Sequence, residues 1–177
     1  MRQSSRFFLA AIVAAATLSL FTIATPKSVE ASPVQLAKCS NLIIGAGSPG
    51  AAAGSAWMEV LVVNDGTRCQ IRGYPTMQFF DSKGKLIDRI DQHTGVGEYA
   101  TPSPKRVILD HWAVASFGIT WSDNPVGSQH CPTAAWANIS LPGSAVASSS
   151  SSVGVDIAPC GGGVTVTPIE LGAVPAK

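Results

Sequence analysis

Residues 57–75 read WMEVLVVNDGTRCQIRGYP, and this stretch decides the fold. Trp57–Val63 is rich in β-branched and aromatic residues, which favour a strand. Asn64-Asp65-Gly66 is typical of a tight turn, because these residues accept the backbone angles that turns require. Arg68–Arg72 then alternates polar and apolar residues, as a half-buried strand does, and Gly73-Tyr74-Pro75 ends it. The stretch therefore predicts two strands joined by a tight turn.

The same pattern of short predicted strands, separated by turns rich in Gly, Pro, Asn or Asp, continues on both sides of this stretch. We expect further strands at Asn41–Ile44, Met77–Asp81, Leu86–Ile90, Val107–Leu109, Ala113–Trp121, Val153–Ile157 and Val164–Thr167. Another strand should end with Ile139 and Leu141. The Ala-rich run Pro49–Ala56 is a poor helix because Gly50, Gly54 and Ser55 interrupt it. The serine run Ser148–Ser152 predicts an exposed loop. Regular strand spacing without helices predicts an all-β domain, a β-sandwich or a barrel.

Composition agrees with a globular domain and disfavours some partners. Only 13% of the residues are charged and 46% are hydrophobic, which excludes a disordered chain. Removing residues 1–31 lowers the basic count from 12 to 9 and the acidic count from 11 to 10, leaving a net charge of −1. No run of Lys and Arg follows, so the sequence predicts neither a nucleic-acid binder nor a polybasic membrane-surface protein.

The N-terminus has the pattern of an export signal. Arg2 and Arg6 precede the apolar run Phe7–Ala24, Pro26 breaks that run, and Val29-Glu30-Ala31 offers small residues at the positions that signal peptidase reads. We expect cleavage after Ala31 and a secreted or extracellular protein without a transmembrane segment after processing.

Two alternatives keep the chain in the cell envelope. An uncleaved Phe7–Ala24 would be a short membrane anchor, but its Ser and Thr content and the cleavage site disfavour this. A lipid anchor would need a small residue before Cys39, where Lys38 stands. We therefore expect residues 1–31 to be a signal peptide and residues 32–177 to form a single β-sandwich domain with its core at 39–170.

Four cysteines in an exported chain predict disulfides. Among the three possible pairings we favour Cys39–Cys69 and Cys131–Cys160, which close loops of similar length. Zinc is disfavoured because no two cysteines have the C-x-x-C spacing.

Residues 42–65 contain a pattern that resembles a dinucleotide-binding fingerprint. Gly45, Gly47 and Gly50 have the spacing G-x-G-x-x-G, and Asp65 follows the next apolar strand. The fingerprint needs a helix after the glycines and an alternating α/β fold, and the sequence predicts neither. We therefore expect no cofactor.

No catalytic or metal-binding constellation is apparent elsewhere. His93, His111 and His130 lack the spacing of metal ligands, and Asp88 and Asp91 would point to opposite sides of a strand. The chain is therefore not expected to be an enzyme.

Two tryptophans are the candidate ligand-binding residues. Trp112 falls opposite the face that Phe117 and Trp121 share, and Trp136 shares a face with Asn138 and Ser140. Exposed on a sheet, these indoles would form a platform for a sugar or a peptide. We favour the other interpretation, in which loops such as Gly95–Pro104 cover them.

The landmarks together resemble the domain-of-unknown-function family numbered forty-two thirty-two, which occurs in exported and lipid-anchored proteins of actinobacteria. The matching features are Cys39 with Leu42, Gly50–Gly54, Leu61–Gly66, Cys69 before Gly73-Tyr74-Pro75, Asp81–Gly84, Ala115–Trp121, Cys131, and Cys160 before Val164–Pro168. The resemblance implies an immunoglobulin-like β-sandwich and explains the Gly/Ala stretch without a cofactor. It implies no activity and no functional residues, and the missing lipobox indicates release rather than anchoring.

The sequence thus favours a secreted, cofactor-free, disulfide-bonded binding module with an extracellular or envelope partner. A structural envelope component without a small ligand is the second interpretation. A nucleotide-dependent enzyme that uses the segment GAGSPG is the third.

The export prediction can be tested by mass spectrometry of the protein in the medium. We expect an N-terminus at Ser32 and no acyl mass, because Ala31 ends the signal and Lys38 disrupts the lipobox. An intact N-terminus in the membrane fraction would contradict cleavage.

Overall fold

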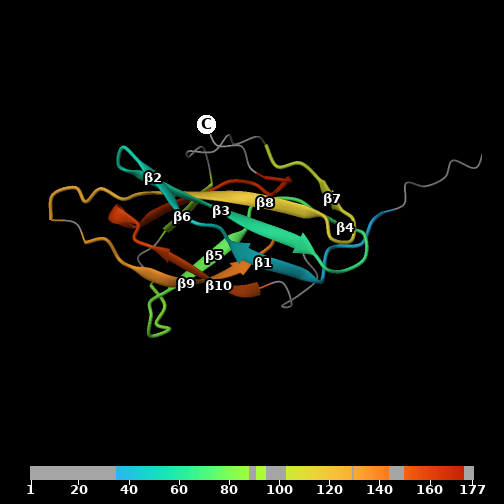
Figure 1. The fold of residues 1–177 in the computed structure, drawn as a ribbon, viewed down its shortest axis with the longest axis horizontal. Helices are drawn as coiled ribbons and strands as arrows, with labels where there is room; N and C mark the ends of the chain where they lie inside the picture. The colour runs from blue at the N-terminus through green and yellow to red at the C-terminus, as the bar shows by residue number, and fades with distance from the viewer. Residues whose placement is uncertain (1–34, 88–90, 95–102, 129, 144–149, 174–177) are drawn as a thin grey trace, which may run out of the picture. The chain divides into compact units, whose positions relative to one another are not determined.

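The computed structural model describes residues 35–87, 91–94, 103–128, 130–143 and 150–173. These residues form twelve strands and one short 3-10 turn, η1 (Cys160–Gly162), and the strands pack as layers of β-sheet (Figure 1). The predicted signal peptide, the loop 95–102 and Asp88 lie outside the described residues. The prediction of an all-β fold is confirmed.

The largest sheet is built on two long antiparallel strands, β3 (Ser55–Asn64) and β8 (Val114–Ser122), which pair along nine residues. Its order is β1-β3-β8-β11-β6, with β2 added beside β3 and β12 beside β8. The bounds of these flanking strands are β1 Leu42–Ala46, β2 Gly50–Ala52, β6 Asp91–Thr94, β11 Gly163–Val166 and β12 Glu170–Leu171. Pairing is antiparallel except between β11 and β6.

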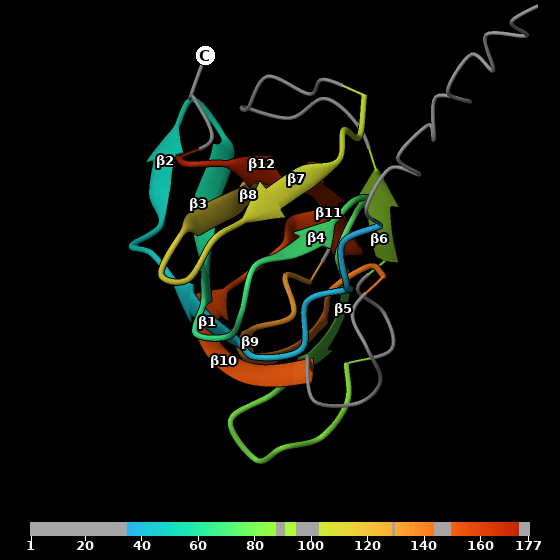
Figure 2. The same cartoon turned by 90° about the vertical axis from the view of Figure 1, so that its right-hand side faces the viewer.

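Two smaller sheets complete the domain. One has the order β10-β9-β5 and consists of β5 (Thr76–Phe80), β9 (Ala134–Ser140) and β10 (Ser150–Ile157). The other pairs β4 (Cys69–Ile71) with β7 (Val107–Leu109). Viewed from one end, β4 and β7 lie in front, with the three-stranded sheet below them (Figure 2).

The core forms where the inward faces of the sheets meet. Along β3 every second residue is buried, and in β8 Phe117 and Ile119 are fully buried. The three-stranded sheet contributes Phe79 and Ile139 to the same core cluster. Large apolar side chains thus alternate with outward residues, which is the pattern of strands packed on one face. The outward positions of β8 are the small or polar Ser116, Gly118 and Thr120, and they too are buried.

The strand prediction missed four segments. Residues 50–52 form β2, residues 170–171 form β12, and residues 150–152 begin β10 instead of lying in a loop. Each of these segments has weak strand propensity and gains its hydrogen bonds from a longer neighbour, so tertiary pairing overrides the local preference. The fourth is β6, at residues 91–94. Of the strand predicted at Leu86–Ile90, residues 88–90 lie outside the described residues, and Leu86 makes an isolated bridge to Phe80.

Both predicted disulfides are confirmed, Cys39–Cys69 and Cys131–Cys160. Cys39 and Cys69 are buried, so the first bond lies inside the core and ties the segment before β1 to β4. The second joins the segment before β9 to η1. Such cross-links stabilise the fold mainly by restricting the unfolded chain.

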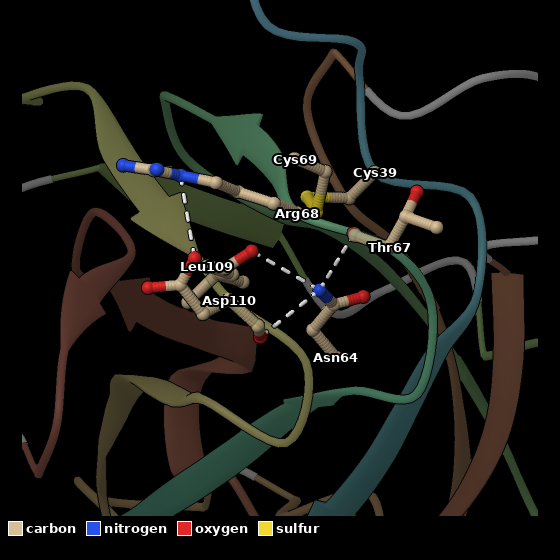
Figure 3. Close-up of polar contacts among 7 residues, drawn as sticks. All are labelled: Cys39, Asn64, Thr67, Arg68, Cys69, Leu109 and Asp110. Carbon is tan, nitrogen blue, oxygen red and sulfur yellow. Dashed lines mark hydrogen bonds and ion pairs between the residues drawn. A yellow bond between two sulfur atoms is a disulfide. The ribbon is translucent and has the colours of Figure 1, made fainter.

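One buried amide organises the turns beside the first disulfide. The Nδ2 group of Asn64 donates to the carbonyl oxygens of Thr67, Leu109 and Asp110 at 3.0–3.1 Å (Figure 3). Its Oδ1 atom accepts from the backbone N–H of Gly66 at 3.0 Å. Asn64 therefore joins the turn that follows β3 to the turn that follows β7.

Replacement of Asn64 tests this role. Asn64→Ala should lower the free energy of unfolding by about 2–4 kcal/mol, because the buried carbonyl oxygen of Leu109 loses its amide donor and the two turns lose the side chain that joins them. Asn64→Asp should cost at least as much, since a carboxylate oxygen would replace the amide donor at nearly constant volume. Chemical denaturation measures both.

The adjacent Asp65 provides the control. Its side chain is exposed, so Asp65→Ala should change the free energy of unfolding by no more than about 0.5 kcal/mol. Equal losses in the two alanine variants would contradict a special role for the buried amide.

Candidate functional site

The outward face of the three-stranded sheet carries one large aromatic side chain. Trp136 lies on the central strand β9 and is 47% exposed, although its neighbours Ala137 and Ile139 are buried. Asn138 and Ser140 point to the same side, as the alternation in the sequence predicts. The structure therefore presents Trp136 on the surface of the sheet.

The register of the sheet explains how Trp136 is positioned. Phe80 of β5 and Gly154 of β10 are its direct partners on either side. A Cβ atom on Gly154 would lie 3.7 Å from Cζ3 of the indole, so the tryptophan packs against the space that glycine leaves open. The half-buried Phe80 stands on the opposite side. An aromatic that rests on a cross-strand glycine is a stabilising arrangement in sheets, and it restricts the indole before any ligand arrives.

Polar side chains form the next row across the same face. Gln78 of β5 and Ser152 of β10 are the direct partners of Asn138 on the central strand β9. A shallow pocket of about 380 Å³ lies over these two rows and is lined by Phe80, Gly84, Trp136, Asn138 and Ser152. No charged side chain is among these five described residues. We call this surface the Trp136 face.

Trp112 is also exposed, but it does not lie in a strand. It follows Asp110 and His111 in the turn between β7 and β8, where the N–H of Ala113 donates to the carbonyl oxygen of Asp110. This turn ends the alternation that the sequence suggested, and β8 begins at Val114. Trp112 is 58% exposed, and its ring lies 5.0 Å from that of His111 between the ring centres.

The backbone of Trp112 is unusual, because its φ angle of 62° lies in the left-handed region. That conformation suits glycine at such a turn position and is unfavourable for a tryptophan. The N–H of Trp112 donates to the carbonyl oxygen of Asn64 at 2.7 Å, which holds the turn against the end of β3.

The two tryptophans belong to different parts of the fold. Trp112 stands at the turn beside Asn64, and Trp136 stands on the middle of the three-stranded sheet with Phe80 and Gly154. The structure does not bring the two indoles into one pocket. In β5, Met77 and Phe79 are buried, and Phe80 is directed to the outer face. This alternation can be read in the sequence, and it could have identified Phe80 as a partner of Trp136.

The glycine-rich segment adopts a different structure from a dinucleotide site. Gly45 lies in β1 and Gly50 opens β2, and both strands pair with β3. The indole of Trp57 covers Gly50, where an added Cβ atom would lie 2.7 Å from Cε2. A dinucleotide fingerprint directs the pyrophosphate to a helix N-terminus, and this strand pair supplies none. Gly47 and Gly50 instead permit close packing against Glu59 and Trp57 of β3.

The histidines do not converge in the part of the chain that the structure describes. His111 and His130 are exposed, and His93 lies in β6. The ring Nδ1 of His111 is 3.1 Å from the carbonyl oxygen of Gly66. No group of three or more His, Cys, Asp or Glu side chains with metal-binding geometry occurs among the described residues.

Comparison with known proteins identifies a family for this chain. A family model described as "Domain of unknown function (DUF4232)" matches residues 38–170. No curated protein and no solved structure matches the chain. Within the described residues, no helix has the length and apolar character needed to cross a membrane.

Trp112 offers a direct test of whether its indole contributes to stability. Trp112→Gly should leave the free energy of unfolding unchanged or raise it by up to about 1 kcal/mol, because glycine tolerates the left-handed backbone. Trp112→Val should lower it, since a β-branched residue tolerates that backbone poorly. A loss of about 3 kcal/mol or more in Trp112→Gly would instead show that the indole packs as a core side chain.

Proposed function

This chain belongs to the DUF4232 family, and we propose that it is an exported, cofactor-free binding module that recognises a neutral glycan through the Trp136 face. The family carries no assigned activity, so the proposal depends on the chemistry of this surface. Two disulfides are compatible with an extracellular location, and the N-terminal sequence predicts export.

The observation that carries the proposal is the pre-positioned indole. Trp136 is held between Phe80 and Gly154 and still exposes about half of its surface. The apolar faces of a sugar ring pack well on an aromatic plane, which offers a large contact area. An indole that the sheet already restricts loses little conformational freedom on binding.

The polar row supplies the hydrogen bonds that sugar hydroxyls need. Gln78 and Asn138 each carry an amide donor and an acceptor, and Ser152 carries a hydroxyl. Gln78 and Ser152 are exposed and Asn138 is half-buried, so all three can exchange water for ligand. The pocket lining lacks charged side chains, which favours a neutral ligand over an acidic one.

The position of the site favours a glycan over a peptide. An extended peptide commonly binds a sheet by adding main-chain hydrogen bonds to an edge strand. Trp136 lies on β9, whose backbone is already paired with β5 and β10. A ligand there must bind through its faces and hydroxyl groups, as a sugar does.

The same lining favours binding over hydrolysis. Glycoside hydrolases use two carboxyl groups on either side of the scissile bond. The five described residues around the pocket include no carboxylate, histidine or cysteine. We therefore propose a non-enzymatic role.

The proposal predicts that Trp136 is needed for binding and dispensable for folding. A glycan array should reveal neutral ligands of the wild-type protein, and calorimetry of the best ligand should show about a tenfold or greater loss in Trp136→Ala. Trp136→Phe should retain part of the affinity. Trp112→Ala is the matched control, because it removes another exposed indole, which lies outside this face.

Two results would contradict the proposal. One is the absence of any neutral glycan among the ligands of the folded wild-type protein. The other is a loss of affinity in Trp136→Ala that is matched by Trp112→Ala. Far-ultraviolet circular dichroism and thermal melting of each variant show that the comparison is made between folded proteins.

A further inference from the structure

Three basic side chains that are distant in the sequence meet at one end of the sandwich. Lys38, Arg72 and Arg106 line a pocket of about 510 Å³. The other residues of its lining are Gln70, Ile71 and Gly143. All three cations are exposed, and the lining contains no acidic residue among the described part of the chain. We call this the basic pocket.

Extending the register of β4 and β7 by one position sets two of these charges opposite each other. Ile71 is the last residue of β4 and pairs with Val107, the first residue of β7. Arg72 and Arg106 come directly after and before these partners, at the end of the antiparallel ladder. Like charges at opposed positions of neighbouring strands repel one another and destabilise the pair.

The third basic side chain, Lys38, lies on the other side of β4. Lys38 forms a parallel bridge with Gln70, and the N–H of Gln70 donates to the carbonyl oxygen of Ala37 at 2.9 Å. Gln70 and Arg72 lie two residues apart and so share the outward face of β4, whereas Ile71 between them is buried. Lys38, Arg72 and Arg106 therefore surround one point on that outward face.

The nearby acidic side chains do not neutralise these cations. Asp110 pairs with Arg68, whose Nε lies 3.3 Å from Oδ1 (Figure 3). Glu170 lines the adjoining pocket with Arg106, but the two form no ion pair in the described structure. The Nε of Arg72 donates to the carbonyl oxygen of Pro104 at 3.2 Å, which holds this side chain at the rim. Among the residues that the structure describes, the positive charge of the pocket is thus uncompensated.

We propose that the basic pocket binds the phosphate group of an anionic ligand. Guanidinium groups match the oxygens of phosphate with two parallel hydrogen bonds, and a lysine adds a point charge. Three cations suit a phosphate group, which carries up to two negative charges, better than a single carboxylate. Binding such an anion would also relieve the repulsion between Arg72 and Arg106.

This site is distinct from the Trp136 face, because the two pockets share no lining residue. Phosphate binding therefore does not depend on glycan binding. Either property can be lost by substitution while the other is retained.

Inorganic phosphate is the first probe. Added to the purified protein at constant ionic strength, it should raise the melting temperature more than chloride does, because it binds the folded state. Isothermal titration of Arg72→Gln and Arg106→Gln should each show about a tenfold or greater loss of phosphate affinity, since charge-assisted hydrogen bonds are removed. Without phosphate and at low salt, Arg106→Gln should melt no lower than the wild type.

Arg68→Gln is the matched control, because Asp110 already neutralises this arginine. It should keep the phosphate affinity of the wild type. Equal effects of phosphate and chloride on melting, or unchanged affinity in the double variant Arg72→Gln/Arg106→Gln, would overturn the proposal.

Vesicles distinguish the source of the phosphate group. Sedimentation with phosphatidylcholine vesicles that contain phosphatidate should show binding that is lost in Arg72→Gln/Arg106→Gln if the ligand is a lipid headgroup. Binding of inorganic phosphate without binding of vesicles would assign the pocket to a soluble phosphate compound. Tighter binding of duplex DNA than of either probe, with the same dependence on the two arginines, would overturn both assignments.

Discussion

The buried amide of Asn64 is the interaction on which one end of the domain depends. Its side chain satisfies backbone groups in the turn after β3 and in the turn after β7, and its own backbone bonds to Trp112 and Ala113. A buried polar group is tolerated only when it is hydrogen-bonded, so this network admits one arrangement of the two turns. The adjacent Cys39–Cys69 bond fixes the same region covalently.

These constraints explain how the basic pocket can exist. Strands β4 and β7 are only three residues long, and Arg72 and Arg106 adjoin the last pair of their ladder. So short a pair would be marginal alone, and like charges weaken it further. Asn64 and the disulfide hold the other end of the pair in place, which lets the domain keep two opposed arginines at its surface.

The two candidate surfaces use the outward side of the fold in different ways. On the Trp136 face, a glycine opposite a tryptophan gives a neutral platform with amide and hydroxyl groups. In the basic pocket, Lys38, Arg72 and Arg106 come from separate chain segments beside β4, and no aromatic side chain lines the pocket among the described residues. A neutral sugar needs an aromatic surface with neutral polar groups, and a phosphate group needs positive charge. We therefore propose that the Trp136 face binds the sugar and the basic pocket binds the phosphate group.

The sequence by itself determined the all-β class, both disulfides and the outward direction of Trp136, because alternation, turn residues and cysteine pairing are local or chemically restricted signals. It misplaced Trp112, because only the turn closed by Asp110 and Asn64 shows where β8 begins. It also contained no basic run, although Lys38, Arg72 and Arg106 meet in one pocket. Strand register decides which distant residues become neighbours, and register is set by pairing and burial over the whole sheet.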